Sequence, residues 1–250
     1  MRIVDAGLVA TIAASSILPS QLPCFGPPPS TLEEYKRRHA VEEAFEKYWI
    51  SGIKTSEEDE KLLAQSGEFA STYGEVTPEG ARSIFTALGI GLKEKDLFGD
   101  LGSGVGKLAV QAYLETGVQN VIAVELSTER DRRGRSSWSR CVRSGEAERI
   151  RGAEDFDSSA VQFVCSDIME APLDNVTHCF CSNLCFSHDA IRRLSGKIAS
   201  MTSLHRAATL KPLLSSSGMR PMGTIRAAMS WNIAGGGTEV YLYEKKSIER

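Results

Sequence analysis

Short apolar runs alternate with longer amphipathic segments through the middle of the chain. The run Leu97–Asp100 predicts a buried strand, and the apolar spacing in Gly106–Thr116 predicts the helix that follows it. Near the C-terminal end two apolar runs flank Gly235, Gly236 and Gly237 without a helical segment between them, which predicts an antiparallel hairpin. The predicted strands are Leu97–Asp100, Asn120–Glu125, Gln162–Cys165, His178–Ser182, Ala207–Leu210, Ile225–Trp231 and Glu239–Glu244. This alternation predicts an α/β fold whose doubly wound, mostly parallel sheet ends in the hairpin.

A helical part precedes this pattern. Ser30–Glu34 supplies a cap and acidic residues for a first turn, which predicts a helix that runs to about Ile50. A second helix is expected around Ser56–Ser66, and its charge run Glu57–Lys61 is interpreted as a solvated face. Further helices are predicted at Pro78–Ile90, Glu129–Arg151 and Asp189–Met201, and loops at Glu146–Ser159 and Leu214–Gly218. The chain then divides into an apolar, proline-rich segment (1–29), a helical part (30–72) and the main domain (73–250).

The first segment contains an apolar run, Gly7–Leu18, behind Arg2 and ahead of several prolines. It is similar to the hydrophobic region of a signal or organelle-targeting sequence, although Asp5 is unusual there. At about a dozen residues the run is too short for a comfortable membrane span. The other interpretation is an apolar arm that lies on the domain.

Composition and charge restrict the classes of partner. The chain has 250 residues, 42% of them hydrophobic and 24% charged, which is ordinary for a globular protein. Its formal net charge of -3 gives no global basic field, so a nucleic-acid contact would need a local basic patch. The segment Glu129–Arg151 holds most of the positive charge, and we interpret it as a solvated helix face.

The six cysteines do not predict a metal site. Cys179, Cys181 and Cys185 are close together, but their spacing matches none of the paired patterns typical of zinc. Cys179 and Cys181 would share one face of a strand, where free cysteine packs well. We expect core packing in a reducing compartment.

The loop after the first strand is the first candidate binding element. Its sequence, Asp100-Leu101-Gly102-Ser103-Gly104-Val105-Gly106, allows positive φ angles and a close backbone approach, next to the N-terminus of a helix. The glycine spacing differs from the dinucleotide pattern G-x-G-x-x-G. Asp100 would repel a pyrophosphate, whereas it can bind the ammonium group of an amino-acid moiety.

Two further acidic residues follow the next strands. Glu125 ends its strand where it can accept hydrogen bonds from a ribose diol, a feature that enzymes using NAD and S-adenosylmethionine share. Asp167 can accept from an adenine amino group while Ile168 packs on the ring. Together with the loop, these residues favour S-adenosylmethionine over NAD.

Two polar segments complete the candidate site. Ser182, Asn183 and Phe186 follow the fourth strand, at the sheet edge where open α/β folds bind ligands. Methyl transfer needs a positioned, unprotonated nucleophile and little water, which short polar groups beside an aromatic wall can provide. Tyr73, with Gly74, Glu75, Val76 and Thr77 behind it, can contact the methionine end of the cofactor. The alternative for this stretch is a structural loop in which Thr77 caps the helix at Pro78.

With these motifs the chain resembles the Dot1-like (disruptor of telomeric silencing) histone methyltransferases. The matching pieces are TYGEVTPEG, LFGDLGSGVGKLAVQA, AVELS, FVCSDI and SNLCFSHDAIRRL, followed by RAATLKPL and the strand with Trp231. The resemblance implies a seven-stranded, Rossmann-like methyltransferase fold and methylation of lysine seventy-nine of histone H3. It implies that Ser182, Asn183, Phe186, Tyr73 and Trp231 serve the lysine channel and catalysis. The residues implied to bind S-adenosylmethionine are Tyr73, Gly74, Glu75, Val76, Thr77, Phe98, Asp100, Leu101, Gly102, Ser103, Gly104, Val105, Gly106, Lys107, Glu125, Asp167 and Ile168.

The resemblance also implies a nucleosome partner and a nuclear location, whereas a targeting role for residues 7–18 would imply an organelle or secretion. We expect a monomer that does not span a membrane and binds no specific nucleic-acid sequence. The family usually has two asparagines where this chain has Ser182 and Asn183, together with a larger helical N-terminal part and a basic tail or loop. A non-histone protein or a small molecule is therefore the alternative acceptor. Two other hypotheses are an inactive module that binds cofactor or chromatin and, least favoured, an NAD-dependent oxidoreductase.

Overall fold

The computed structural model describes residues 26–49, 56–64, 74–93, 95–232 and 236–245. The predicted apolar run at residues 7–18 and the candidate site residue Tyr73 lie outside these ranges.

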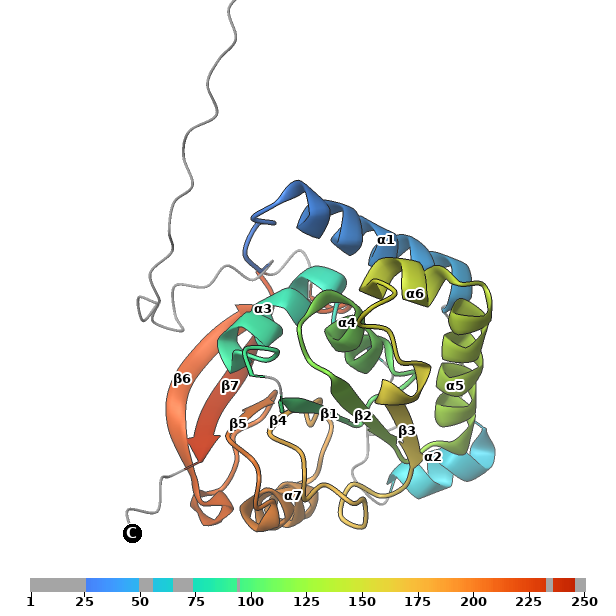
Figure 1. Ribbon diagram of the computed structural model, residues 1–250. Helices are drawn as coiled ribbons and strands as arrows, with labels where there is room; N and C mark the ends of the chain where they lie inside the picture. Colours follow the sequence, from blue (N-terminus) through green and yellow to red (C-terminus); the bar gives the residue numbers. More distant parts are fainter. Residues whose placement is uncertain (1–25, 50–55, 65–73, 94, 233–235, 246–250) are drawn as a thin grey trace, which may run out of the picture.

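A seven-stranded sheet forms the centre of the molecule (Figure 1), and its strand order is β3-β2-β1-β4-β5-β7-β6. The strands are β1 (Leu97–Leu101), β2 (Asn120–Glu125), β3 (Val161–Cys165), β4 (His178–Cys181), β5 (Arg206–Thr209), β6 (Met219–Ala227) and β7 (Thr238–Lys245). The first five are parallel, and β7 runs antiparallel to both of its neighbours. The predicted parallel sheet with an antiparallel C-terminal hairpin is confirmed.

Helices cover both faces of the sheet, and several of them begin at a serine or threonine cap. Thr31, Thr77, Ser127 and Ser187 each accept a hydrogen bond from a backbone N–H in the first turn that follows, which satisfies a donor that the helix itself leaves unpaired. The helices are α1 (Leu32–Tyr48), α2 (Glu57–Ala64), α3 (Pro78–Leu88), α4 (Lys107–Glu115), α5 (Thr128–Arg143), α6 (Glu146–Arg151) and α7 (His188–Ser200).

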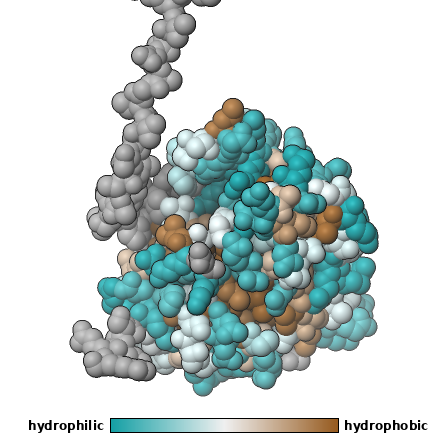
Figure 2. Space-filling model, viewed as in Figure 1, coloured by the Kyte–Doolittle hydropathy of each residue, from teal (hydrophilic) through white to brown (hydrophobic). Residues whose placement is uncertain are grey.

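Two hydrophobic clusters fill the spaces between the layers. One cluster joins the sheet to α3, α4 and α5, with α1 and α6 packed outside, and it includes Phe98, Tyr113 and Phe180. The other lies beneath α7 and includes Leu101 and Leu194. Each such fully buried side chain contributes about 1.5–3 kcal/mol relative to exposure. On the outside, hydrophilic residues cover most of the face seen in Figure 2, and the visible hydrophobic residues gather mostly near its centre.

Two predicted elements differ from the structure. The helix expected at Glu129–Arg151 is interrupted at Gly145, whose φ of 75° ends one helix and begins the next, so α6 occupies part of the expected loop Glu146–Ser159. The strand expected at Ile225–Trp231 begins earlier, at Met219, and ends at Ala227. Proline and glycine near its start are tolerated because β6 is an edge strand with an irregular register there.

The cysteines in the described ranges carry free thiols. Cys179 and Cys181 are buried on one face of β4, as the pattern predicted. Among the residues that the structure describes, no group of three or more His, Cys, Asp or Glu side chains is arranged to hold a metal ion. Within the same ranges, the helices are all too short or too polar to cross a membrane.

Candidate functional site

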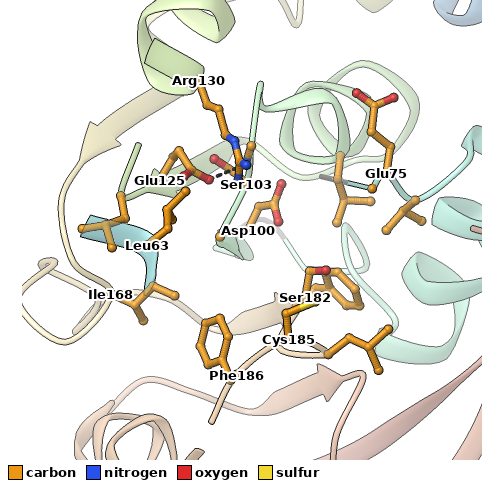
Figure 3. Close-up of a pocket in the computed structure, with 18 of the residues that line it drawn as sticks. Leu63, Glu75, Asp100, Ser103, Glu125, Arg130, Ile168, Ser182, Cys185 and Phe186 are labelled. Atoms are coloured by element: carbon orange, nitrogen blue, oxygen red, sulfur yellow. Dashed lines mark hydrogen bonds between the residues drawn. The ribbon is translucent and has the colours of Figure 1, made fainter. Parts of the chain in front are cut away.

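A cavity of about 330 Å³ opens at the carboxyl-terminal edge of the sheet (Figure 3). Its walls come from the loops after β1, β2, β3 and β4, from residues 74–76 ahead of α3, and from single residues of α2 and of the chain beyond β6. Figure 3 shows Glu125, Ile168 and Leu63 on one side of the cavity and Glu75 on the other, with Asp100 between them. Ligands of open α/β sheets bind at this edge.

The glycine loop has the conformation that its sequence predicted. Gly102, Gly104 and Gly106 have φ angles of 83°, 58° and 75°, which only glycine adopts readily. The backbone N–H groups of Gly102 and Ser103 donate to the carbonyl of Val124 at 2.8 and 2.9 Å, which ties the loop to β2. A side chain on Gly106 would also collide with the ring of Phe163, because its Cβ would lie 2.5 Å from Cε1.

Glu125, the last residue of β2, holds the glycine loop through a hydrogen bond. Its Oε2 accepts from the N–H of Gly104 at 2.7 Å and its Oε1 from the N–H of Ser127 at 2.8 Å, and the residue is 4% exposed. Burial raises the pKa of this carboxyl, although the backbone donors oppose the shift. The carboxylate therefore lines the cavity in a fixed orientation, with further lone pairs available to a ligand.

Asp100 is more unusual, because its buried oxygen Oδ2 has no hydrogen-bond partner among the described residues. The hydroxyl of Ser103 is likewise buried without a partner there, and both residues line the cavity. Burial, reinforced by the charge of Glu125, raises the pKa of Asp100 from 3.8 to about 7. Buried polar atoms without partners are costly, so this pair fits a ligand that brings its own donors and positive charge.

The segment ahead of α3 packs along the chain that leaves β6, and this brings residues 74–76 to the cavity. Val76 forms an antiparallel bridge with Met229, and the N–H of Thr77 donates to the carbonyl of Ala228 at 3.1 Å. At the cavity Glu75 forms an ion pair with Lys107, with 2.7 Å between Oε2 and Nζ. Trp231 lies so close to Gly74 that a Cβ there would be 2.4 Å from the indole ring. Trp231 thus lines the cavity although it lies outside β6.

The residues after β4 divide between the cavity and the core. Ser182, Cys185 and Phe186 line the cavity, whereas Asn183 is completely buried and does not. The side-chain oxygen of Asn183 accepts from the N–H groups of Leu210 and Lys211, both at 2.8 Å, and its amide donates to the carbonyl of Lys211 at 3.2 Å. Asn183 therefore joins the loop after β4 to the loop after β5, away from the acceptor channel predicted for it.

Most of the predicted cofactor residues that the structure describes line the cavity, and the other described ones support its walls. Phe98, Leu101 and Val105 are buried in the two hydrophobic clusters. Gly106 precedes α4, and Thr77 caps α3 by accepting from the N–H of Gly80, as the structural alternative for its segment predicted. The predicted residues that line the cavity are Gly74, Glu75, Val76, Asp100, Gly102, Ser103, Gly104, Lys107, Glu125, Asp167, Ile168, Ser182, Phe186 and Trp231.

Sequence reasoning missed several wall residues. Leu184 and Cys185 lie between the predicted site residues Asn183 and Phe186, and this position in the loop after β4 is the signal that could have found them. Arg193 on α7 forms an ion pair with Asp167, with 3.3 Å between Nη2 and Oδ2. Leu63 comes from α2 and carries no local signal. The remaining missed wall residues are Leu108, Leu126, Arg130, Met169, Phe180 and Ala190.

A family model described as histone methylation protein DOT1 matches residues 55–220, more than half of the chain. The chain belongs to this DOT1 family. It is therefore an S-adenosylmethionine-dependent methyltransferase, and the buried acceptors at Asp100 and Ser103 suit a cationic amino-acid group such as this cofactor carries. No curated protein matches the sequence.

Solved structures with the same fold are distant in sequence. Geranyl diphosphate C-methyltransferase from Streptomyces coelicolor, solved with S-adenosyl-L-homocysteine, is 14% identical with a TM-score of 0.50, over 88% of this chain and 100% of that one. A candidate RNA methyltransferase from Pyrococcus horikoshii gives the same identity, TM-score and coverage. A geranyl diphosphate methyltransferase bound to sinefungin gives a TM-score of 0.51 at 10% identity, over 83% of this chain and 100% of that one. At these identities the likeness shows the fold alone.

Proposed function

We propose that this DOT1-family protein is a protein-lysine N-methyltransferase that modifies a lysine in the globular core of histone H3, of the lysine seventy-nine type. The observation that carries the proposal is that the family match spans both the glycine loop and the loop after β4, which line one cavity. The description of the family names histone methylation, and both of these loops lie inside the matched residues.

In this proposal the polar half of the cavity holds the cofactor. Asp100 and the Ser103 hydroxyl bind the ammonium group, and Glu125 binds the ribose hydroxyls. Asp167 and Ile168 bind the adenine, and Gly74, Val76 and the Glu75–Lys107 pair border the methionine end. The placement rests on the buried unpartnered oxygens of Asp100 and Ser103 and on the fixed orientation of Glu125.

The other half receives the lysine. Bound S-adenosylmethionine supplies the electrophilic methyl group. Phe186, Leu184 and Trp231 exclude water from the acceptor, and an apolar environment lowers the pKa of an amine, so that its lone pair is free to attack. The hydroxyl of Ser182 accepts a hydrogen bond from the amine and orients it in line with the methyl carbon.

The test is methylation by the full chain with radiolabelled S-adenosylmethionine, using nucleosomes or free histones as acceptors. We expect label on histone H3 in nucleosomes, and no label when lysine seventy-nine of H3 is replaced by arginine. Asp100→Ala serves as the control that weakens cofactor binding. Transfer to a non-histone protein or a small molecule, with no transfer to H3, would support the alternative acceptor and oppose this proposal.

A histone acceptor also requires that the protein reach the nucleus. Fluorescence localisation of the full chain checks this requirement. Accumulation in an organelle or in the secretory route would instead favour a targeting role for residues 7–18.

A further inference from the structure

Helix α2 presents only part of its acidic run to solvent. Helix α2 (cyan in Figure 1) lies at the N-terminus of α5, and its two buried residues are Asp59 and Leu63. The neighbouring Glu57, Glu58 and Glu60 are exposed. Residues four apart share one face of a helix, so Asp59 and Leu63 both face the main domain. The expectation of a solvated run is wrong for Asp59, because it is only 5% exposed.

Asp59 caps a helix other than its own. Its Oδ2 accepts from the hydroxyl of Ser127 at 2.5 Å and from the N–H of Glu129 at 3.1 Å, and its Oδ1 accepts from the N–H of Thr128 at 3.2 Å. These donors stand at the N-terminus of α5, where unpaired N–H groups and the helix dipole favour a carboxylate. The long helix α5 is therefore held at its first turn by a side chain from α2.

The same turn is bonded to the cofactor side of the cavity. The N–H of Ser127 donates to Oε1 of Glu125, and Oε2 of Glu125 accepts from the N–H of Gly104 in the glycine loop. A continuous set of hydrogen bonds thus runs from α2 through Ser127 and Glu125 to the glycine loop. A change at Asp59 reaches the loop without contacting the cavity directly, since Asp59 itself does not line the cavity.

Leu63 connects α2 to the cavity a second time. It is 6% exposed and lines the wall on the same side as Glu125 and Ile168 (Figure 3). A helix docked through Asp59 therefore places an apolar side chain over this half of the cavity.

We propose that Asp59 is a positioning residue for the cofactor: it docks α2 on the N-terminus of α5, so that Leu63 closes the cavity wall and Glu125 keeps its orientation. The inference rests on the proposed cofactor site. It requires that changes at Asp59 weaken cofactor binding and spare the chemical step. The KM for S-adenosylmethionine should rise, while kcat at saturating cofactor stays close to that of the wild type.

The experiment compares Asp59→Ala, Asp59→Asn and Leu63→Ala with Glu58→Gln, an exposed position one residue away. The probe is S-adenosyl-L-homocysteine in calorimetry, with steady-state kinetics in parallel. For Asp59→Ala we expect about 10- to 100-fold weaker binding, because charge-assisted hydrogen bonds to three donors are lost. Asp59→Asn should give a smaller loss, since its amide keeps one acceptor oxygen. Glu58→Gln should bind like the wild type.

Hydrogen exchange supplies a second readout. S-adenosyl-L-homocysteine should slow exchange in residues 57–64 of the wild type and fail to do so in Asp59→Ala. If Asp59 had only a structural role, Asp59→Ala would lower the thermal midpoint and the fraction of active enzyme. The KM for S-adenosylmethionine would then not rise selectively over the KM for the acceptor. If Asp59→Ala does not fold, the affinities of Asp59→Asn and Leu63→Ala for S-adenosyl-L-homocysteine test the positioning role instead.

Glu125→Ala separates failure of this inference from failure of the proposed site. Weakened binding in Glu125→Ala together with wild-type affinity in the Asp59 variants would overturn the positioning role alone. Wild-type affinity in Glu125→Ala would place the cofactor elsewhere and overturn both.

Discussion

At the proposed cofactor end of the cavity the polar groups are backbone amides and buried carboxylates, whereas at the proposed acceptor end they are a serine hydroxyl and a thiol among apolar side chains. Glu125 at the end of β2 accepts a hydrogen bond from the glycine loop, and the loop donates two more to the carbonyl of Val124 on the same strand. Leu184 and Trp231 at the other end are 37% and 43% exposed. The proposed cofactor end is therefore preorganised by secondary structure, while the proposed acceptor end is shaped by loops and is more exposed to solvent.

The greatest loss of stability is expected from a residue that belongs to neither end. Asn183→Ala should lower the free energy of unfolding by about 2–4 kcal/mol, because the buried N–H groups of Leu210 and Lys211 lose their acceptor. Urea unfolding measures this change. Ser182→Ala is the matched control, and we expect it to keep stability and lower turnover. If Asn183→Ala were as stable as the wild type and reduced only turnover, the asparagine would act at the acceptor end after all.

Asp100 tests the cofactor end. Asp100→Asn should weaken cofactor binding by about 1–3 kcal/mol, since a cationic group loses its charged partner. The pKa of Asp100 in the folded chain is raised to about 7 from 3.8, so folding favours the protonated form. Its contribution to the free energy of unfolding therefore falls as pH rises between these two values, and that dependence should disappear in Asp100→Asn.

The raised pKa of Asp100 also makes cofactor affinity depend on pH, because a cationic group binds the ionised carboxylate. Cofactor affinity should rise with pH until the pH passes about 7, and binding below that pH should release a proton. Calorimetry in buffers of different ionisation enthalpy measures the number of protons released on binding. Asp174→Asn, at an exposed position outside the cavity, should preserve both effects. An Asp100→Asn protein with unchanged affinity and pH dependence would remove Asp100 from the cofactor site.

The same contrast explains what could be predicted from the sequence. The strand ends and the glycine loop follow from local rules of periodicity and φ angle, so Asp100, Glu125 and Asp167 were found at the cavity. Asn183 and Ser182 are adjacent polar residues, and only the packing of the loop after β5 decides which one faces the cavity. Leu63 was missed for the same reason, because its helix reaches the cavity through a tertiary contact at Asp59 rather than through a local pattern.

The smallest effect is expected where a charged pair stands at the rim. Arg193 and Asp167 are 54% and 39% exposed, so solvent screens their attraction and the pair contributes at most about 1 kcal/mol. Oδ1 of Asp167 also accepts from the N–H of Met169 at 2.9 Å, which keeps the loop in shape without the arginine. Arg193→Ala should therefore weaken cofactor binding by less than about fivefold, and so should Arg192→Ala, which removes a neighbouring charge. A loss above tenfold confined to Arg193→Ala would mean that this arginine contacts the cofactor, and that the preorganised end extends onto α7.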